Sequence, residues 1–124
     1  MPRRNDKSRA GRYAYEGLER VMHEKARLGL LTSLAAHAEG LSFTDLKELC
    51  ALTDGNLARH LQVLEEAELV EIEKQERRTL CRLSDAGRER FLEYLAELER
   101  VVRDAARATG RSKGRGAEPG FSSA

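Results

Sequence analysis

The sequence predicts a mainly α-helical α+β fold, with three helices, a β-hairpin and a long C-terminal helix. Leu and Ala recur at helical spacing over most of residues 16–67. Apolar and charged residues then alternate from Val70 to Glu73, which is typical of a half-buried strand. The chain has no Trp and only 5% aromatic residues, a composition that favours Leu/Ala-cored helices over a β-sandwich.

The first two helices are predicted from apolar spacing and stop signals. The first covers most of residues 16–38, with a break near His23, and Gly40 follows its end. The second is short, covers residues 43–50 and has Ser42 as its N-cap.

The third helix follows a tight connection and covers residues 54–67, capped by Thr53. Leu57, Leu61 and Leu64 are spaced four and three apart and are expected to face the core. The outward face then carries polar side chains, which are Asn56, Arg59 and His60.

The hairpin and the last helix complete the predicted fold. A strand over residues 70–73 is followed by a polar turn, residues 75–78, and a returning strand, residues 79–83. Ser84 is expected to cap a final helix over residues 85–108.

The 124 residues are expected to form one domain, residues 15–108, between two basic ends. Residues 1–14 are predicted to be a disordered basic arm, and the Gly/Ser-rich residues 109–124 a flexible tail. The net charge is only +1, so the basic ends flank a balanced or acidic middle. No apolar run approaches the roughly 20 residues of a membrane span, and no secretory signal is recognised, so we expect a cytoplasmic protein.

The pattern of titratable residues does not predict an enzyme, a metal centre or a cofactor site. His23, His37 and His60 have no ligand-like spacing with each other or with the cysteines. Cys50 and Cys81 are expected to be reduced, partly buried thiols, with a redox switch as the alternative. No phosphate-binding loop or nucleophile elbow is present.

A short helix, a tight turn, a helix with a polar outer face and a hairpin together indicate a helix-turn-helix unit that binds DNA. Such a unit lays its second helix in a major groove about 12 Å wide. There, Asn pairs with adenine and Arg with guanine.

Two segments carry a family resemblance: LSFTDLKELCALTDGNLARHLQVLEEAELVEIEKQ and TLCRLSDAGRERF. They resemble the MarR/ArsR-type winged-helix transcription regulators. The resemblance is greatest to a small subgroup whose third helix begins with the sequence Leu-Thr-Asp-Gly-Asn-Leu, which is found here at residues 52–57. The resemblance implies a dimeric regulator on a pseudo-palindromic operator. It also implies that Thr44 and Thr53 lie near phosphates, that Asn56, Arg59 and His60 reach bases or phosphates, and that Arg77 and Arg78 form the wing tip. Glu68 stands where related chains usually have Gly, so a left-handed helix end is expected to be strained there.

A heptad-like stripe on the last helix predicts a dimer seam, formed with the first helix. Its members recur four and three apart: Phe91, Leu95, Leu98, Val102 and Ala105. The alternative is that this stripe covers only the chain's own core.

We therefore expect a homodimer that binds double-stranded DNA, acts as a repressor and is nucleoid-associated when bound. A small-molecule effector is possible but is not identified by the sequence. The alternative is a winged-helix module that binds another protein instead of DNA, which the acidic middle of the chain favours.

Overall fold

The computed structural model describes residues 11–110, which form two compact units. The main unit consists of residues 18–94, and the end unit combines residues 11–17 with residues 95–110. The remainder of the predicted arm and tail lies outside the described residues. The predicted domain boundaries stay a prediction.

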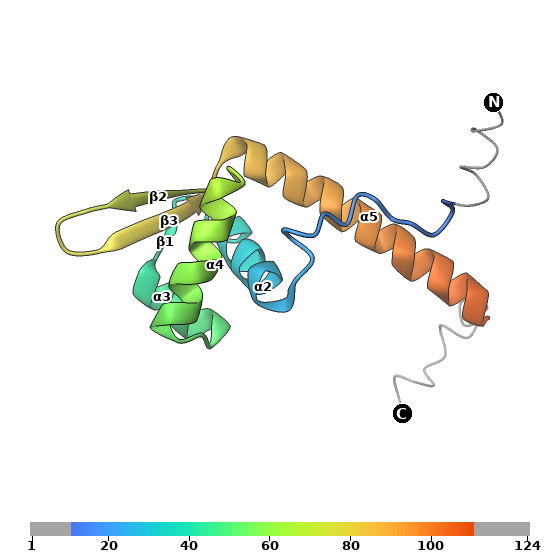
Figure 1. Cartoon of the computed structure of the whole chain (residues 1–124), viewed down its shortest axis with the longest axis horizontal. Helices are drawn as coiled ribbons and strands as arrows, with labels where there is room; N and C mark the ends of the chain where they lie inside the picture. The colour runs from blue at the N-terminus through green and yellow to red at the C-terminus, as the bar shows by residue number, and fades with distance from the viewer. Residues whose placement is uncertain (1–10, 111–124) are drawn as a thin grey trace. The chain divides into compact units, whose positions relative to one another are not determined.

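The elements follow the predicted order, helix, helix, helix, strand, strand, helix, with one short strand added (Figure 1). Their bounds are α2 Lys25–Ala35, β1 Leu41–Ser42, α3 Phe43–Cys50, α4 Asp54–Glu66, β2 Val70–Lys74, β3 Thr79–Leu83 and α5 Asp85–Thr109.

Hydroxyl side chains cap the N-terminal ends of three helices, at the three positions predicted from the sequence. Ser42 Oγ accepts the Asp45 amide at 3.0 Å, and Thr53 Oγ1 accepts the Asn56 amide at 3.1 Å. Ser84 Oγ accepts the Gly87 amide at 2.8 Å. Each bond satisfies an amide that has no partner within its own helix, so all three predicted caps are confirmed.

The sheet has three antiparallel strands in the order β1-β3-β2. The hairpin pairs Val70 with Leu83 and Lys74 with Thr79, while β1 pairs Leu41 with Cys81. Strand β1 was not predicted. Its two residues are too few to show an alternating pattern, and their partners lie about 40 positions further along the chain.

The core of the main unit is built from Leu side chains, as the composition predicts. α4 contributes Leu57, Leu61 and Leu64, all at most 3% exposed, and β3 contributes Cys81 and Leu83 from one face. α2 packs against α3, α4 and β3. This core fixes the positions of α3, α4 and the hairpin.

The first predicted helix is only partly correct. α2 covers Lys25–Ala35, whereas residues 18–24 form turns, with the Met22 and His23 amides both bonded to Glu19 O. Glu24 has extended backbone angles, φ −155° and ψ 134°, and its carboxylate accepts the Arg27 amide at 2.8 Å. A residue that caps α2 in this way cannot also continue a helix from before it.

In the end unit, residues 11–17 lie along the C-terminal half of α5. The Tyr15 hydroxyl donates to Asp104 at 2.8 Å, and the Gly17 amide donates to Glu97 at 3.1 Å. The Arg100 guanidinium lies 5.0 Å from the centre of the Tyr15 ring. One polar side of α5 is therefore covered by the chain's own N-terminal segment.

Within residues 11–110, none of the helices combines the length and the apolar character needed to cross a membrane.

Candidate nucleic-acid interface

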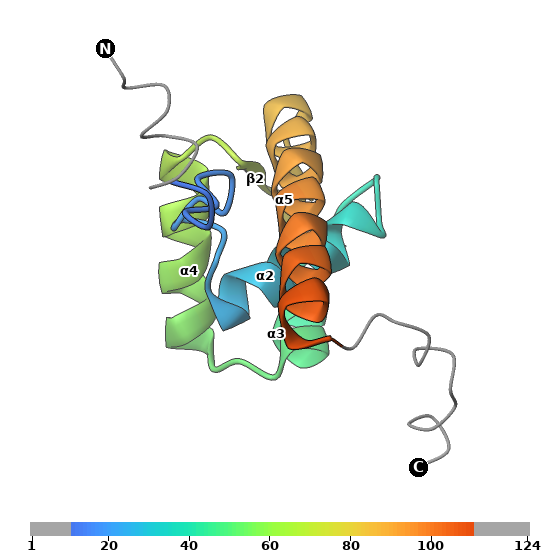
Figure 2. The same ribbon diagram turned by 90° about the vertical axis from the view of Figure 1, so that its right-hand side faces the viewer.

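The connection between α3 and α4 is a tight turn closed at both ends. Ala51 adopts left-handed angles, with φ 53°, and the Ala51 and Leu52 amides bond back to the last turn of α3. An ion pair of 2.9 Å then joins Lys47 to Asp54, the first residue of α4, and raises the pKa of Lys47. Figure 2 shows this turn linking the ends of α3 and α4. The geometry matches the predicted helix-turn-helix.

The exposed face of α4 carries the two side chains best suited to reading bases. Asn56 and Arg59 are both exposed, as predicted, and Arg59 Nη2 donates to Asn56 Oδ1 at 3.1 Å. Both side chains retain free donors and acceptors, because each can make several hydrogen bonds. The pair can therefore present an amide and a guanidinium side by side.

The N-terminal ends of α3 and α4 are also open to solvent. Thr44 and Thr53 are exposed there. Gly55, which the sequence pattern does not single out, lies in the first turn of α4, and a Cβ at this position would have no atom within 4 Å. The backbone of α4 is thus accessible to a phosphate at its N-terminal end.

The expectation that His60 projects outward is wrong. The residue is buried, with 8% of its surface exposed, and its Nδ1 lies 3.2 Å from Arg27 Nη1. His60 lies three residues after Leu57 and four before Leu64, so it belongs to the inward stripe of α4. Burial lowers its pKa, an effect that Glu24 opposes and Arg27 and Arg59 reinforce.

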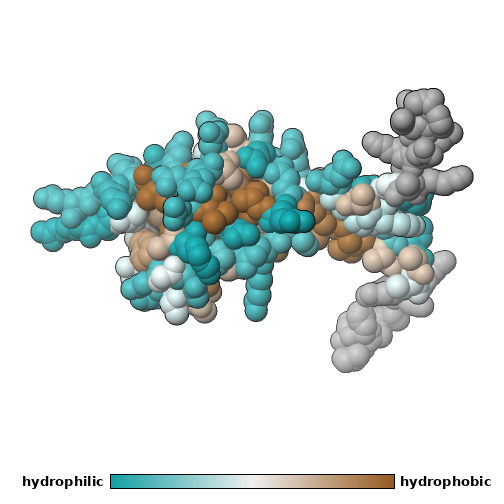
Figure 3. Space-filling model, viewed as in Figure 1, coloured by the Kyte–Doolittle hydropathy of each residue, from teal (hydrophilic) through white to brown (hydrophobic). Residues whose placement is uncertain are grey.

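The wing is a hairpin with a four-residue turn, residues 75–78. The Gln75 amide donates to Arg78 O at 2.8 Å, and Arg78 Nε donates to Gln75 Oε1 at 3.1 Å. Arg77 and Arg78 are both exposed at this tip, where they are predicted to lie. Figure 3 shows a hydrophilic surface over the wing.

The acidic residues of the wing are partly neutralised within the hairpin. Arg82 on β3 lies 3.4 Å from Glu71 and 3.6 Å from Glu73, both on β2. These ion pairs reduce the net negative charge on the two strands of the wing. The repulsion that these two carboxylates would exert on a polyanion is correspondingly smaller.

The predicted dimer seam divides between the two units. Phe91 belongs to the main unit, where it is 3% exposed and stacked on Tyr94, with ring centres 6.0 Å apart. It therefore packs inside its own unit and offers no surface to a partner.

In the end unit, Leu95, Leu98 and Val102 line a groove on α5, and Val102 is 61% exposed. Figure 3 shows hydrophobic surface over this half of α5. Ala105 is exposed on the same helix.

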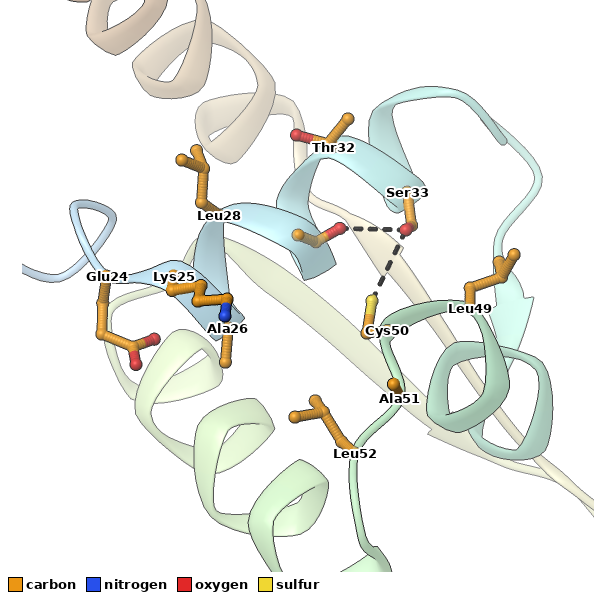
Figure 4. Close-up of a pocket in the computed structure, with 11 residues that line it drawn as sticks. Glu24, Lys25, Ala26, Leu28, Thr32, Ser33, Leu49, Cys50, Ala51 and Leu52 are labelled. Atoms are coloured by element: carbon orange, nitrogen blue, oxygen red, sulfur yellow. Dashed lines mark hydrogen bonds between the residues drawn. The ribbon is translucent and has the colours of Figure 1, made fainter.

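A cavity of about 890 Å³ lies in the main unit between α2 and the end of α3 (Figure 4). Its walls include Leu28, Leu49 and Cys50, whose sulfur lies 3.6 Å from the Ser33 hydroxyl. Cys50 and Cys81 are both free thiols, as expected. Burial raises the pKa of Cys81 to about 11, which keeps this thiol protonated and unreactive near neutral pH.

Comparison with known proteins agrees with this geometry. Residues 26–102 match the family model described as a winged helix DNA-binding domain. A search of curated protein sequences gave no significant match.

Solved structures of regulators share the fold. A transcriptional regulator homologue from Pyrococcus horikoshii OT3 is 28% identical, with a TM-score of 0.68 over 73% of this chain and 93% of that chain. The transcriptional repressor BigR from Xylella fastidiosa is 25% identical, with a TM-score of 0.55 over 75% and 90%. A MarR family regulator from Silicibacter pomeroyi is 21% identical, with a TM-score of 0.54 over 94% and 80%, and so supports the fold alone.

The family match covers more than half of the chain, and the solved structures described above are named as transcriptional regulators. This chain therefore belongs to the winged helix DNA-binding domain family, and transcriptional regulators are among the solved structures that share its fold.

Proposed function

We propose that this protein is a dimeric, sequence-specific DNA-binding transcription regulator. In the proposed complex, α4 lies in the major groove with Asn56 and Arg59 toward base edges. Thr44 and Thr53 contact phosphates, and the arginines of the wing tip contact the backbone or the minor groove. His60 is not among the proposed contacts, because it is buried.

The observation that carries the proposal is the exposed Asn56–Arg59 pair on α4. Bidentate contacts by these two residue types are the common means of distinguishing adenine and guanine in the major groove. The pair lies on a helix whose opposite side is anchored by three buried Leu residues. Anchoring of this kind lowers the entropy that the protein loses when it orders a reading surface on binding.

The dimer and the repressor role extend this proposal. The groove lined by Leu95, Leu98 and Val102 supports a second copy as the partner of α5. Two-fold symmetry would set two copies of α4 about 34 Å apart, one turn of DNA, on a pseudo-palindromic site. The relative BigR is described as a transcriptional repressor, which supports the same role here.

Selection of bound duplexes from a random DNA pool tests the function directly. We expect enrichment of a two-fold symmetric sequence and an affinity that falls linearly with log salt, because phosphate contacts release counterions. A scrambled duplex of the same length is the control for sequence-independent binding.

A flat selection, with no sequence enriched and little salt dependence, would contradict the proposal. If the chain then captured a protein partner in a salt-insensitive manner, the alternative of a protein-binding module would be supported instead.

A further inference from the structure

The buried His60 on α4 is held by two residues at the start of α2. His60 Nδ1 lies 3.2 Å from Arg27 Nη1 and 4.0 Å from Glu24 Oε1. All three residues belong to the main unit. The contact joins α4, the helix that is proposed to read DNA, to the start of α2.

Arg27 is itself held through its side chain and through its backbone. Its Nε donates to Val21 O at 2.7 Å, and its amide donates to the Glu24 carboxylate at 2.8 Å. The guanidinium therefore cannot easily turn away from His60. We describe the three side chains Glu24, Arg27 and His60 as the α2–α4 joint.

The chemistry of the joint selects one protonation state of His60. A guanidinium only donates hydrogen bonds, so His60 Nδ1 must accept, and the ring is neutral with its proton on Nε2. Protonation at Nδ1 would remove this bond and leave two cations in contact. The nearest carboxylate oxygen, on Glu24, is the same oxygen that caps α2.

Three charged groups act on His60, and they do not all act in the same direction. Glu24 and Arg27 face it from the start of α2, and Arg59 lies next to it on α4. Burial is the largest effect and lowers the pKa of His60. Arg27 and Arg59 lower it further, while Glu24 raises it.

We propose that the α2–α4 joint positions the DNA-reading helix only while His60 is neutral, so that protonation of His60 loosens α4 and weakens DNA binding. The second part of this inference rests on the proposed function. Asn56 and Arg59 share α4 with His60, within about one turn, and move with it.

The direction of the pH effect follows from the lowered pKa. The joint contributes its full stability above pH 6.5, the ordinary pKa of histidine. This contribution is lost as pH falls below 6.5 toward the pKa in the folded protein, because the unfolded chain binds the proton more readily.

The first arm of the test follows the joint without DNA. Amide shifts of the full chain are recorded by NMR between pH 8 and pH 5. We expect the amides of Arg27 and of α4 to titrate with the His60 ring at one midpoint. His60→Asn retains an acceptor near the position of Nδ1 but has no titrating ring, and it should abolish this transition. His37→Asn, the matched control, should retain it.

Arg27→Met keeps the test decisive if His60→Asn does not fold. Loss of the guanidinium should raise the His60 midpoint, which a merely structural role of Arg27 would not require. A wild-type protein in which α4 amides do not follow the His60 ring would overturn the inference. So would an unchanged midpoint in Arg27→Met.

The second arm measures binding of a duplex selected at pH 7.5, at constant ionic strength. Wild type should lose affinity on moving to pH 5.5, by up to about tenfold for each unit by which the His60 pKa in the DNA-bound protein lies below that in the free protein. His60→Asn should lose none. Equal losses in both proteins would overturn the inference. If the joint titrates as expected but no duplex is bound at pH 7.5, the proposed function fails and the joint stands.

Discussion

At the scale of single residues, the end of α4 is the clearest case of a side chain in an unfavourable backbone position. Glu68 has φ 63°, in the left-handed region. The Glu68 amide bonds to Glu65 O, and the Leu69 amide bonds to Leu64 O, both at 2.9 Å. This is the Schellman arrangement, in which Gly is the favoured residue at the left-handed position.

Glu68→Gly should therefore stabilise the protein. Removing the Cβ from a left-handed residue relieves about 1 kcal/mol, which corresponds to a rise of about 4–8 °C in the unfolding midpoint of a domain of this size. Thermal unfolding followed by circular dichroism measures the shift. Glu65→Gly removes the same charge from within α4 and should lower the midpoint instead. An unchanged midpoint for Glu68→Gly would mean that the helix ends differently.

A second residue-scale prediction concerns Gly55 in the first turn of α4. A Cβ there meets nothing in the protein, so Gly55→Ala should raise stability by a few tenths of a kcal/mol up to about 1 kcal/mol. If this end of α4 approaches a DNA backbone closely, the added methyl group should weaken binding in the same protein. Stability and affinity would then change in opposite directions. Unchanged affinity would place the phosphate farther from this turn.

The three Leu residues of α4 do not by themselves define its inward face, which also includes His60. The spacing of residues 57, 60, 61 and 64 is itself a complete helical stripe, so the position of His60 could have been predicted. Its partner could not. Arg27 lies 33 residues earlier, and only the packing of α2 against α4 brings the two together.

At the scale of elements, apolar spacing predicted which residues are buried better than it predicted the conformation of the backbone. Leu18, Val21 and Met22 have helical spacing, and Met22 is fully buried, but the segment that carries them forms turns. The Glu24 carboxylate caps a new helix, α2, at the end of this segment. Apolar spacing alone did not locate this start.

The wing is the element for which charge provides the sharpest test. Its tip carries Arg77 and Arg78, while two of its glutamates are already held by Arg82. Replacing both tip arginines by Ala should weaken binding to all duplexes alike. It should also make the log–log salt slope shallower by up to about 1.8, which is about 0.9 for each phosphate that the variant no longer neutralises.

Salt titrations of a selected and a scrambled duplex measure this change. Arg88→Ala removes one exposed charge from α5 and should leave the slope unchanged. If the double variant lost discrimination between duplexes but kept its slope, the wing would read bases instead of contacting phosphates.

At the scale of the whole molecule, the two units contain different parts of α5. The main unit uses its first turns, where the Gly87 position lies so close to Leu69 O that a Cβ would come within 2.0 Å. Phe91 and Tyr94 then complete the core of that unit. Beyond residue 94 the helix carries apolar side chains that its own N-terminal segment leaves open. The sequence predicted one continuous stripe, but could not show where burial within the chain ends.

The exposed part of this stripe leads to the last prediction. Leu98→Glu places a charge in the groove of the end unit and should abolish both dimerisation and tight binding to a two-fold DNA site, because a buried unpaired charge is strongly unfavourable. Val102→Glu, at a position already 61% exposed, should do the same with less risk to the fold of the unit. Ala108→Glu adds the same charge on the side of the helix away from the groove and should remain dimeric. Light scattering is expected to give about twice the 13.9 kDa chain mass for wild type and the single mass for the two groove variants. A monomeric variant that still bound the site tightly would show that one copy of α4 and its wing suffice, and the dimer would lose its place in the mechanism.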